Sequence, residues 1–109
     1  MVDTQLSTVT AKPEIEKEQK TTVGGGEDTL WKVVAHDDPV TTMDFVVRLM
    51  VQVFKKPLIL AEAIMWQVHN EGQSVVVVLP KAEAEQRVRM GTLLARMEGF
   101  PFRLTIEPA

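Results

Sequence analysis

The residues best placed for chemistry are two adjacent carboxylates, Asp37 and Asp38, which follow an apolar run ending at Ala35 and precede Pro39. Carboxylates between a strand and a helix can hold a metal ion or an ammonium group, or they can simply cap a solvated turn. Taken alone, the pair favours the turn. His36 completes a metal-like triplet, but the chain has two histidines and no cysteine. Alternation along the strand also turns His36 away from Asp37, so a metal is the least favoured occupant.

A second candidate is His69, which shares a helical face with Met65 and Val68 at spacings of three and four. A histidine on such a face is most often a core residue with satisfied nitrogens, and a binding role requires a carboxylate nearby. Catalysis finds no support, because no serine has a base placed by spacing. The glycine run Gly24–Gly26 precedes a strand rather than following one, so it is not a phosphate-binding loop.

Composition indicates one domain preceded by a polar tail. Residues 1–30 hold three lysines and six acids, a net charge of −3, whereas residues 31–109 hold nine of each and are neutral. A neutral folded part argues against nucleic acid as the partner. No apolar run approaches the ~20 residues of a membrane span, and we expect neither a secretory signal nor a transit peptide. Without cysteine the chain has no disulfide or zinc–thiolate site, which fits a reducing compartment.

The pattern predicts the order βααβαβ. Residues 1–29 are expected to be disordered because they are polar and aperiodic. The expected strands cover 30–35, 74–79 and the alternating stretch from 102, and the expected helices start at 41 or 42, at 58 and at 80. We expect an α+β fold with three helices on one face of a three-stranded antiparallel sheet.

Five local predictions accompany this order. Four consecutive valines, Val75–Val78, indicate a strand covered on both sides and therefore central. Thr41 and Asp44 have the spacing of a capping box at the start of the first helix. Asp44 and Arg48 are expected to pair at the i,i+4 spacing. Gly72 is placed to end the second helix, and Pro80 suits the first position of the third.

Taken together, these features resemble the ClpS family. The resemblance runs without gaps from Trp31 to Ala109, and its most specific parts are the Asp37-Asp38 turn and the Met-x-x-Val-His-x-x-Gly block from Met65 to Gly72. Members of that family are small adaptors of the Clp unfoldase–protease. They recognise N-terminal destabilising residues, the N-degrons, and hand the substrate to a Clp/Hsp100 ATPase such as ClpA or ClpC. The resemblance therefore implies a non-enzymatic, cofactor-free monomer.

The resemblance also assigns residues. It implies that the substrate's α-amino group is held by Asp37, Asp38 and His69, and that the unfoldase contacts Glu83, Glu85 and Arg87. It implies a hydrophobic pocket lined by Thr41, Met43, Val46, Met65, Val68 and Phe102. Residues 1–29 occupy the position of the family's tail, the segment that the unfoldase engages.

Three positions depart from the family pattern and suggest a divergent paralogue. Asp37 stands where the family has asparagine, Pro39 replaces an acidic residue, and Ala82 replaces a glutamate. Two alternatives stay open: a regulator that docks on the unfoldase without reading degrons, and a ribosomal-stalk-like domain that binds translation factors. The expected location is the bacterial cytoplasm, or a plastid stroma for a homologue that lacks its transit peptide.

Overall fold

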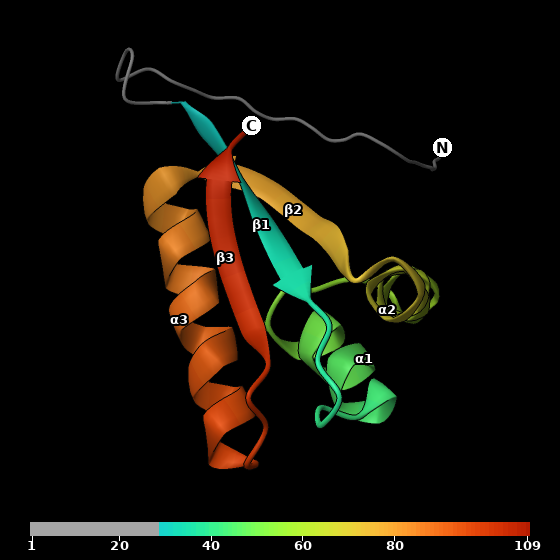
Figure 1. Ribbon diagram of the computed structural model, residues 1–109. Helices are drawn as coiled ribbons and strands as arrows, with labels where there is room; N and C mark the ends of the chain where they lie inside the picture. Colours follow the sequence, from blue (N-terminus) through green and yellow to red (C-terminus); the bar gives the residue numbers. More distant parts are fainter. Residues whose placement is uncertain (1–28) are drawn as a thin grey trace.

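The computed structural model describes residues 29–109, which form three strands and three helices (Figure 1). In chain order these are β1 (Leu30–His36), α1 (Met43–Gln52), α2 (Leu58–Glu71), β2 (Gln73–Pro80), α3 (Lys81–Met97) and β3 (Arg103–Pro108). The predicted α+β class and the order βααβαβ are confirmed. The disordered tail predicted for residues 1–29 lies outside the described residues, apart from Thr29.

The sheet has the strand order β2-β1-β3, with both pairs antiparallel. The prediction that the valine-rich strand is central is wrong, because β1 is central and β2 is an edge. The β1–β2 register shifts between Val33 and Val34, so that Val76 on β2 has no partner. This bulge places Val76 and Val77 in sequence against the core, while Val75 and Val78 stay exposed. A run of four valines is therefore compatible with a bulged edge strand as well as with a buried central strand.

The helices cover one face of the sheet. Val33, Ala35 and Leu104 project from that face into a cluster with Phe45 and Leu49 of α1. Gly91 lets α3 approach β3 closely, because a Cβ atom at that position would lie 2.5 Å from Leu104 Cδ1. The opposite face of the sheet carries polar pairs such as His36 Nε2 and Thr105 Oγ1, 2.7 Å apart.

Helix α1 begins one residue later than the capping-box spacing predicted. Thr42 is the cap, and its hydroxyl accepts a hydrogen bond from the Phe45 amide at 3.2 Å. The predicted box of Thr41 and Asp44 is therefore wrong, since Thr41 bonds elsewhere. The predicted Asp44–Arg48 pair is also replaced: Arg48 forms two hydrogen bonds with Glu98, of 3.0 and 2.9 Å. Glu98 offers a bidentate geometry that a neighbour on the same helix does not.

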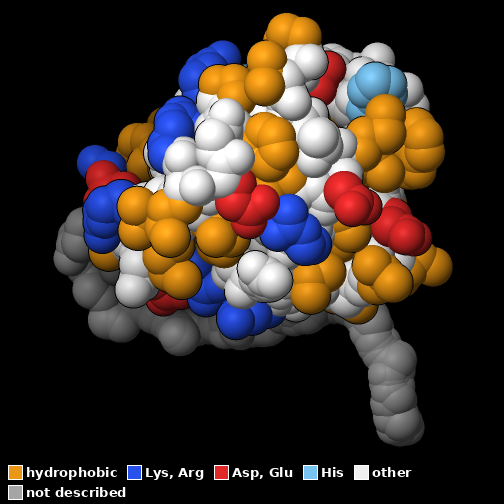
Figure 2. Space-filling model, turned by 90° about the horizontal axis from the view of Figure 1, so that it is seen from below, with side chains coloured by type: hydrophobic (Ala, Val, Ile, Leu, Met, Phe, Trp, Pro, Cys, Tyr) orange, Lys and Arg blue, Asp and Glu red, His pale blue; other side chains and the backbone are white. Residues whose placement is uncertain are grey.

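The ends of the other helices follow local chemistry. Gly72 ends α2 with a left-handed backbone, φ 89°, as predicted. Pro80 is the cap of α3 rather than its first residue, and it also closes β2. Seen from below, hydrophobic side chains remain exposed on the α2 side, at the right of Figure 2, and on the α3 side, at the left. These exposed side chains lie outside the buried core cluster and are therefore available for contact with another molecule.

Candidate functional site

The acidic turn after β1 is fastened to the end of α2. The backbone amide of Asp37 donates a hydrogen bond of 2.9 Å to the carbonyl of Gly72. Gly72 closes the helix that carries His69 in its last turn. The turn and the helix end lie 35 residues apart in the sequence at this bond, yet the fold holds them together. The structure thereby brings the three residues of the predicted amine site to one end of the sheet.

The Asp38 carboxylate accepts three hydrogen bonds from the turn that contains it. Its Oδ1 accepts from the amides of Val40 and Thr41 at 2.9 and 2.7 Å, and its Oδ2 accepts from the Thr41 hydroxyl at 2.7 Å. A carboxylate has about four acceptor positions, so one direction remains for a ligand. The capping interpretation of the sequence is therefore correct for Asp38, and Thr41 is its partner rather than the cap of α1.

The protonation of Asp38 follows from these bonds. Partial burial raises the pKa of the Asp38 carboxyl, but the hydrogen bonds from Thr41 and Val40 and the charge of Arg96 lower it more, to below its ordinary value of 3.8. The group is therefore ionised at neutral pH. A carboxylate that is already charged and anchored is preorganised to meet a cation.

Asp37 and His69 differ from Asp38 because their side chains are exposed and uncommitted. Within residues 29–109 the Asp37 carboxylate has no hydrogen bond or ion pair, and the His69 ring makes only a ring contact. No hydrogen bond or ion pair in that range joins any two of Asp37, Asp38 and His69. His36, the third member of the metal-like triplet, is bonded to Thr105, and burial together with the charge of Arg103 lowers its pKa below 6.5.

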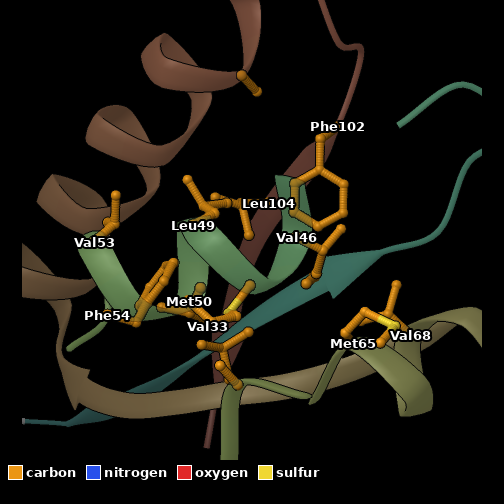
Figure 3. Close-up of a cluster of buried hydrophobic side chains, with 14 of the residues drawn as sticks. Val33, Val46, Leu49, Met50, Val53, Phe54, Met65, Val68, Phe102 and Leu104 are labelled. Atoms are coloured by element: carbon orange, nitrogen blue, oxygen red, sulfur yellow. The ribbon is translucent and has the colours of Figure 1, made fainter. Parts of the chain in front are cut away.

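Four of the six predicted pocket residues meet in one buried cluster (Figure 3). Val46 projects from α1, Phe102 precedes β3, and Met65 and Val68 face them from α2. All four are buried. Of the other two predicted residues, Thr41 is half-buried and Met43 is exposed. The structure therefore places four of the predicted residues in the core and leaves Met43 exposed.

The loop that carries Phe102 is held by Arg96. Its guanidinium donates from one nitrogen to the carbonyls of Phe100 and Phe102, both at 2.9 Å. The Phe100 ring packs on Phe45 with 5.0 Å between ring centroids, and the Phe102 ring meets Phe45 edge-on at 6.4 Å. These contacts fix the Phe102 ring within the cluster.

The sequence patterns did not identify Trp66 as a residue of this region. Trp66 on α2 is half exposed, and its ring meets the His69 ring edge-on with 6.1 Å between centroids. The signal was present, since Trp66 lies one helical turn before His69. A tryptophan in an apolar helix is normally assigned to the core, and only the structure shows that this one faces solvent beside the histidine.

The residues predicted for unfoldase docking lie in the first two turns of α3. Glu83 and Glu85 are exposed, as a contact surface requires. Arg87 is half-buried, and its Nη1 donates to the carbonyl of Val53 at 2.5 Å. This bond ties α3 to the residue that closes α1. Arg87 thus has a structural contact that the sequence did not reveal.

The part of the chain described here contains no group of three or more His, Cys, Asp or Glu residues arranged to hold a metal ion. In the same residues, none of the helices combines the length and apolar character that a membrane crossing requires.

Comparison with known proteins gives a consistent result. The model of the family described as ATP-dependent Clp protease adaptor protein ClpS matches residues 26–105. The chain is 38% identical over 78 residues to the ATP-dependent Clp protease adapter protein ClpS of Lawsonia intracellularis, covering 72% of each chain. It is 42% identical over 79 residues to the protein of the same name from Deinococcus radiodurans, covering 72% of this chain and 70% of the relative.

A solved structure agrees with this relationship. ClpS2 of Agrobacterium tumefaciens, bound to L-phenylalaninamide, superposes with a TM-score of 0.73 and 32% identity, covering 75% of this chain and 99% of that one. The family match extends over most of the chain and includes every element of the described fold up to Thr105. On these grounds the chain belongs to the ClpS family, the adaptor proteins of the ATP-dependent Clp protease.

Proposed function

We propose that this protein binds the bulky hydrophobic N-terminal residues of substrate proteins and delivers them to a Clp/Hsp100 ATPase of the ClpA or ClpC type. One observation carries the proposal. The bond from Asp37 to Gly72 holds the unbonded acceptors of Asp37 and His69 at the end of α2, the helix that also brings Met65 and Val68 into the buried cluster. Charge for an amine and apolar surface for a side chain are the two requirements of such a ligand.

The acceptors near the acidic turn match an N-terminal ammonium group in number and in charge. An N-terminal ammonium group has three N–H donors. Asp38 retains one acceptor direction, the Asp37 carboxylate is unbonded, and a neutral His69 ring offers one nitrogen lone pair. Three donors can therefore be matched by three acceptors, two of them carboxylates, and charge-assisted bonds are about twice as strong as neutral ones.

The apolar first side chain of the substrate is assigned to a pocket that includes two methionines, Met43 and Met65. Met43 is exposed, and Met65 is the most exposed of the four clustered residues. Thioether side chains have three rotatable bonds and repack readily, so they can make room for a first side chain. Covering a phenyl or leucyl group there contributes about 1.5–3 kcal/mol.

The solved relative supports this assignment of chemistry. Phenylalaninamide, bound to ClpS2 of Agrobacterium tumefaciens, carries a free α-amino group and a benzyl side chain. Those are the two groups for which the acidic turn and the apolar cluster are suited. Delivery would use the exposed Glu83 and Glu85 beside Arg87, together with residues 1–29 as the segment that the unfoldase engages. We place the protein, as a monomer, in the bacterial cytoplasm.

The test is calorimetry with peptides that differ only in their first residue: Phe, Leu, Trp, Tyr, Ile and Met, each with an N-acetylated control. We expect Phe and Leu peptides to bind and the acetylated forms to fail, because acetylation removes the charge. His69→Ala should weaken binding, whereas His36→Ala, which changes the histidine bonded to Thr105, should not.

A second variant tests the apolar part. Met43→Ala should admit first residues branched at Cβ, such as Ile and Val, because it removes side-chain volume from the proposed pocket. Equal binding of free and acetylated peptides would contradict the amine site. If no peptide binds while the protein still associates with a Clp ATPase, the function is that of a docking regulator instead.

A further inference from the structure

Helix α2 is apolar on more than its buried side. Ala61, Met65 and Val68 face the core, but Leu58, Ile59 and Trp66 are 58%, 76% and 50% exposed. Ile59, Glu62, Trp66 and His69 follow one another at spacings of three, four and three, so they form one row along the flank of the helix. We call these four residues the α2 ladder.

The ladder is continuous with the candidate amine site. Its last member is His69, and the neighbouring member, Trp66, touches the His69 ring edge-on at 6.1 Å. Leu58 lies one turn before Glu62 and widens the apolar end of the row. In the view from below, hydrophobic side chains with acidic ones between them gather on this side of the molecule (Figure 2). A row of this kind, exposed and adjoining a site, is a candidate for contact with whatever occupies the site.

We propose that the α2 ladder binds the residues that follow the first residue of a substrate. The inference rests on the proposed function, since it takes the substrate's amine to lie at His69. From there Trp66 is about 4.5 Å along the helix, Glu62 about 10 Å and Ile59 about 15 Å, at 1.5 Å rise per residue. An extended peptide advances about 3.3 Å per residue. Trp66 then meets the second residue, Glu62 the fourth and Ile59 the fifth or sixth.

The chemistry of the row defines a preferred segment. Trp66 offers an aromatic surface to an apolar second residue. The Glu62 carboxylate, exposed and without a hydrogen bond or ion pair in residues 29–109, favours a basic fourth residue. Leu58 and Ile59 favour an apolar fifth residue. The substrate class is therefore a chain that begins with a bulky residue and continues with apolar residues and a basic one.

Continuity with the site distinguishes this row from another on the molecule. Met90, Leu93 and Met97 form an exposed apolar row on α3, and Leu93 and Met97 are 63% and 73% exposed. That row does not lead to Asp37 or His69, because α3 lies across α1 from α2 (Figure 1). Leu93 is therefore a matched control: an apolar helix residue whose exposure lies between those of Ile59 and Trp66, but outside the proposed path of the substrate.

The experiment uses the full chain and two amidated peptides that share a free N-terminal Phe. One continues Leu-Ser-Lys-Leu and the other Ser-Ser-Ser-Ser. We expect the first to bind about tenfold tighter, which is about 1.4 kcal/mol. Ile59→Ser and Trp66→Ser should remove most of this difference, and Leu93→Ser should leave it intact. Because all three side chains are exposed, circular dichroism should show the fold unchanged.

A charge exchange makes the test specific. Glu62→Lys should reverse the preference at the fourth position, so that a peptide with Glu there binds better than one with Lys. If both peptides bind equally to the unchanged protein, the inference fails while the proposed function stands. If neither binds, the proposed function fails and the inference with it. Sedimentation that shows a dimer dissolved by Ile59→Ser would overturn the inference in favour of self-association.

Discussion

Charged side chains serve different purposes at the α3 and α2 ends of the molecule. At the C-terminal end of α3 they are bonded within the chain: Arg96 donates to the carbonyls of Phe100 and Phe102, and Arg48 donates two hydrogen bonds to Glu98. Beside α2, Asp37 and Glu62 are exposed and make no side-chain hydrogen bond in residues 29–109.

The difference separates stability from binding. A group whose hydrogen bonds are completed inside the protein contributes to the free energy of folding, and its removal leaves a partner unsatisfied. A group left open to solvent contributes little to folding and keeps its capacity for a ligand. Substitutions at the α3 end should therefore act on stability, to an extent that falls as the bonded group becomes more exposed to water, and those at the α2 end should act on peptide affinity. Asp38, bonded on three sides and open on one, should act on both.

The largest expected effect is the loss of stability on substitution of Phe102. This residue gives the most stringent test of the comparison between the two ends. The resemblance assigned Phe102 to a ligand pocket, but it is 1% exposed and packs against Phe45. Phe102→Ala should lower the free energy of unfolding by about 3–5 kcal/mol, the usual cost of removing a buried phenyl group. Urea titration measures this, and Phe102→Leu is the control that keeps most of the volume. A loss below 1 kcal/mol would mean that Phe102 lines a space rather than filling it.

Asp38 should show an intermediate effect that depends on pH. Asp38→Ala removes three accepted hydrogen bonds and should cost about 1–2 kcal/mol at pH 7. Because the pKa of Asp38 is lowered in the folded state, this stability is present above pH 3.8 and is lost as the pH falls through the lowered value. The gap between the two proteins in thermal unfolding should close in that range. Asp37→Ala is the matched control, and a pH-independent gap would refute the assignment.

Asp37 should affect affinity rather than stability. Asp37→Asn should change the free energy of unfolding by less than about 0.5 kcal/mol, because the side chain is exposed and unbonded. An amide can donate to a substrate carbonyl as well as accept from its amine, and a missing bond costs about 1–3 kcal/mol. Loss of the charge contact costs only about 1 kcal/mol of binding free energy, because such a contact at a wet site is screened by salt. We therefore expect Asp37→Asn to bind a Phe peptide more tightly and with less salt dependence.

Titration calorimetry at two salt concentrations decides this prediction, with Glu107→Gln, which removes a charge from the opposite sheet face, as the control. A tenfold weakening by Asp37→Asn would show that the carboxylate itself is the recognition group.

The smallest effect is expected from the Arg48–Glu98 pair. Both side chains are partly exposed to water, so the pair should contribute little despite its bidentate geometry. A double-mutant cycle with Arg48→Met and Glu98→Gln should give a coupling near the error of a urea titration, and about 1 M salt should reduce it further. A large coupling that resists salt would show that the α3 end depends on this pair more than its exposure suggests.

Much of the candidate site was predictable, because its residues were marked either by their local sequence or by the family pattern. Asp37, Asp38 and His69 were identified from residue types and from a block of eight residues, and the structure brings their segments together. Trp66 was missed, although its spacing from His69 was visible, because propensity alone assigns an apolar helix residue to the core. Arg87 was assigned to docking, and the sequence gave no sign of its bond to Val53, 34 residues earlier.

The sequence by itself determined where elements begin and end. Gly72 stops α2 because it adopts a left-handed backbone without a Cβ penalty, and Thr42 caps α1 through its own hydroxyl. These effects act within a few residues, so a single chain is enough to predict them, although Thr41 and Thr42 were not separable by type.

Only the tertiary structure decided which segments meet. Pairing in the folded chain places β1 between β2 and β3 and puts a bulge at Val76, and four identical valines carry no mark of either. Glu98 rather than Asp44 binds Arg48 because packing places α3's end beside α1. The physical reason is the same in both cases: pairing between distant segments is selected by the geometry of the assembled core, which the local pattern of residues does not contain.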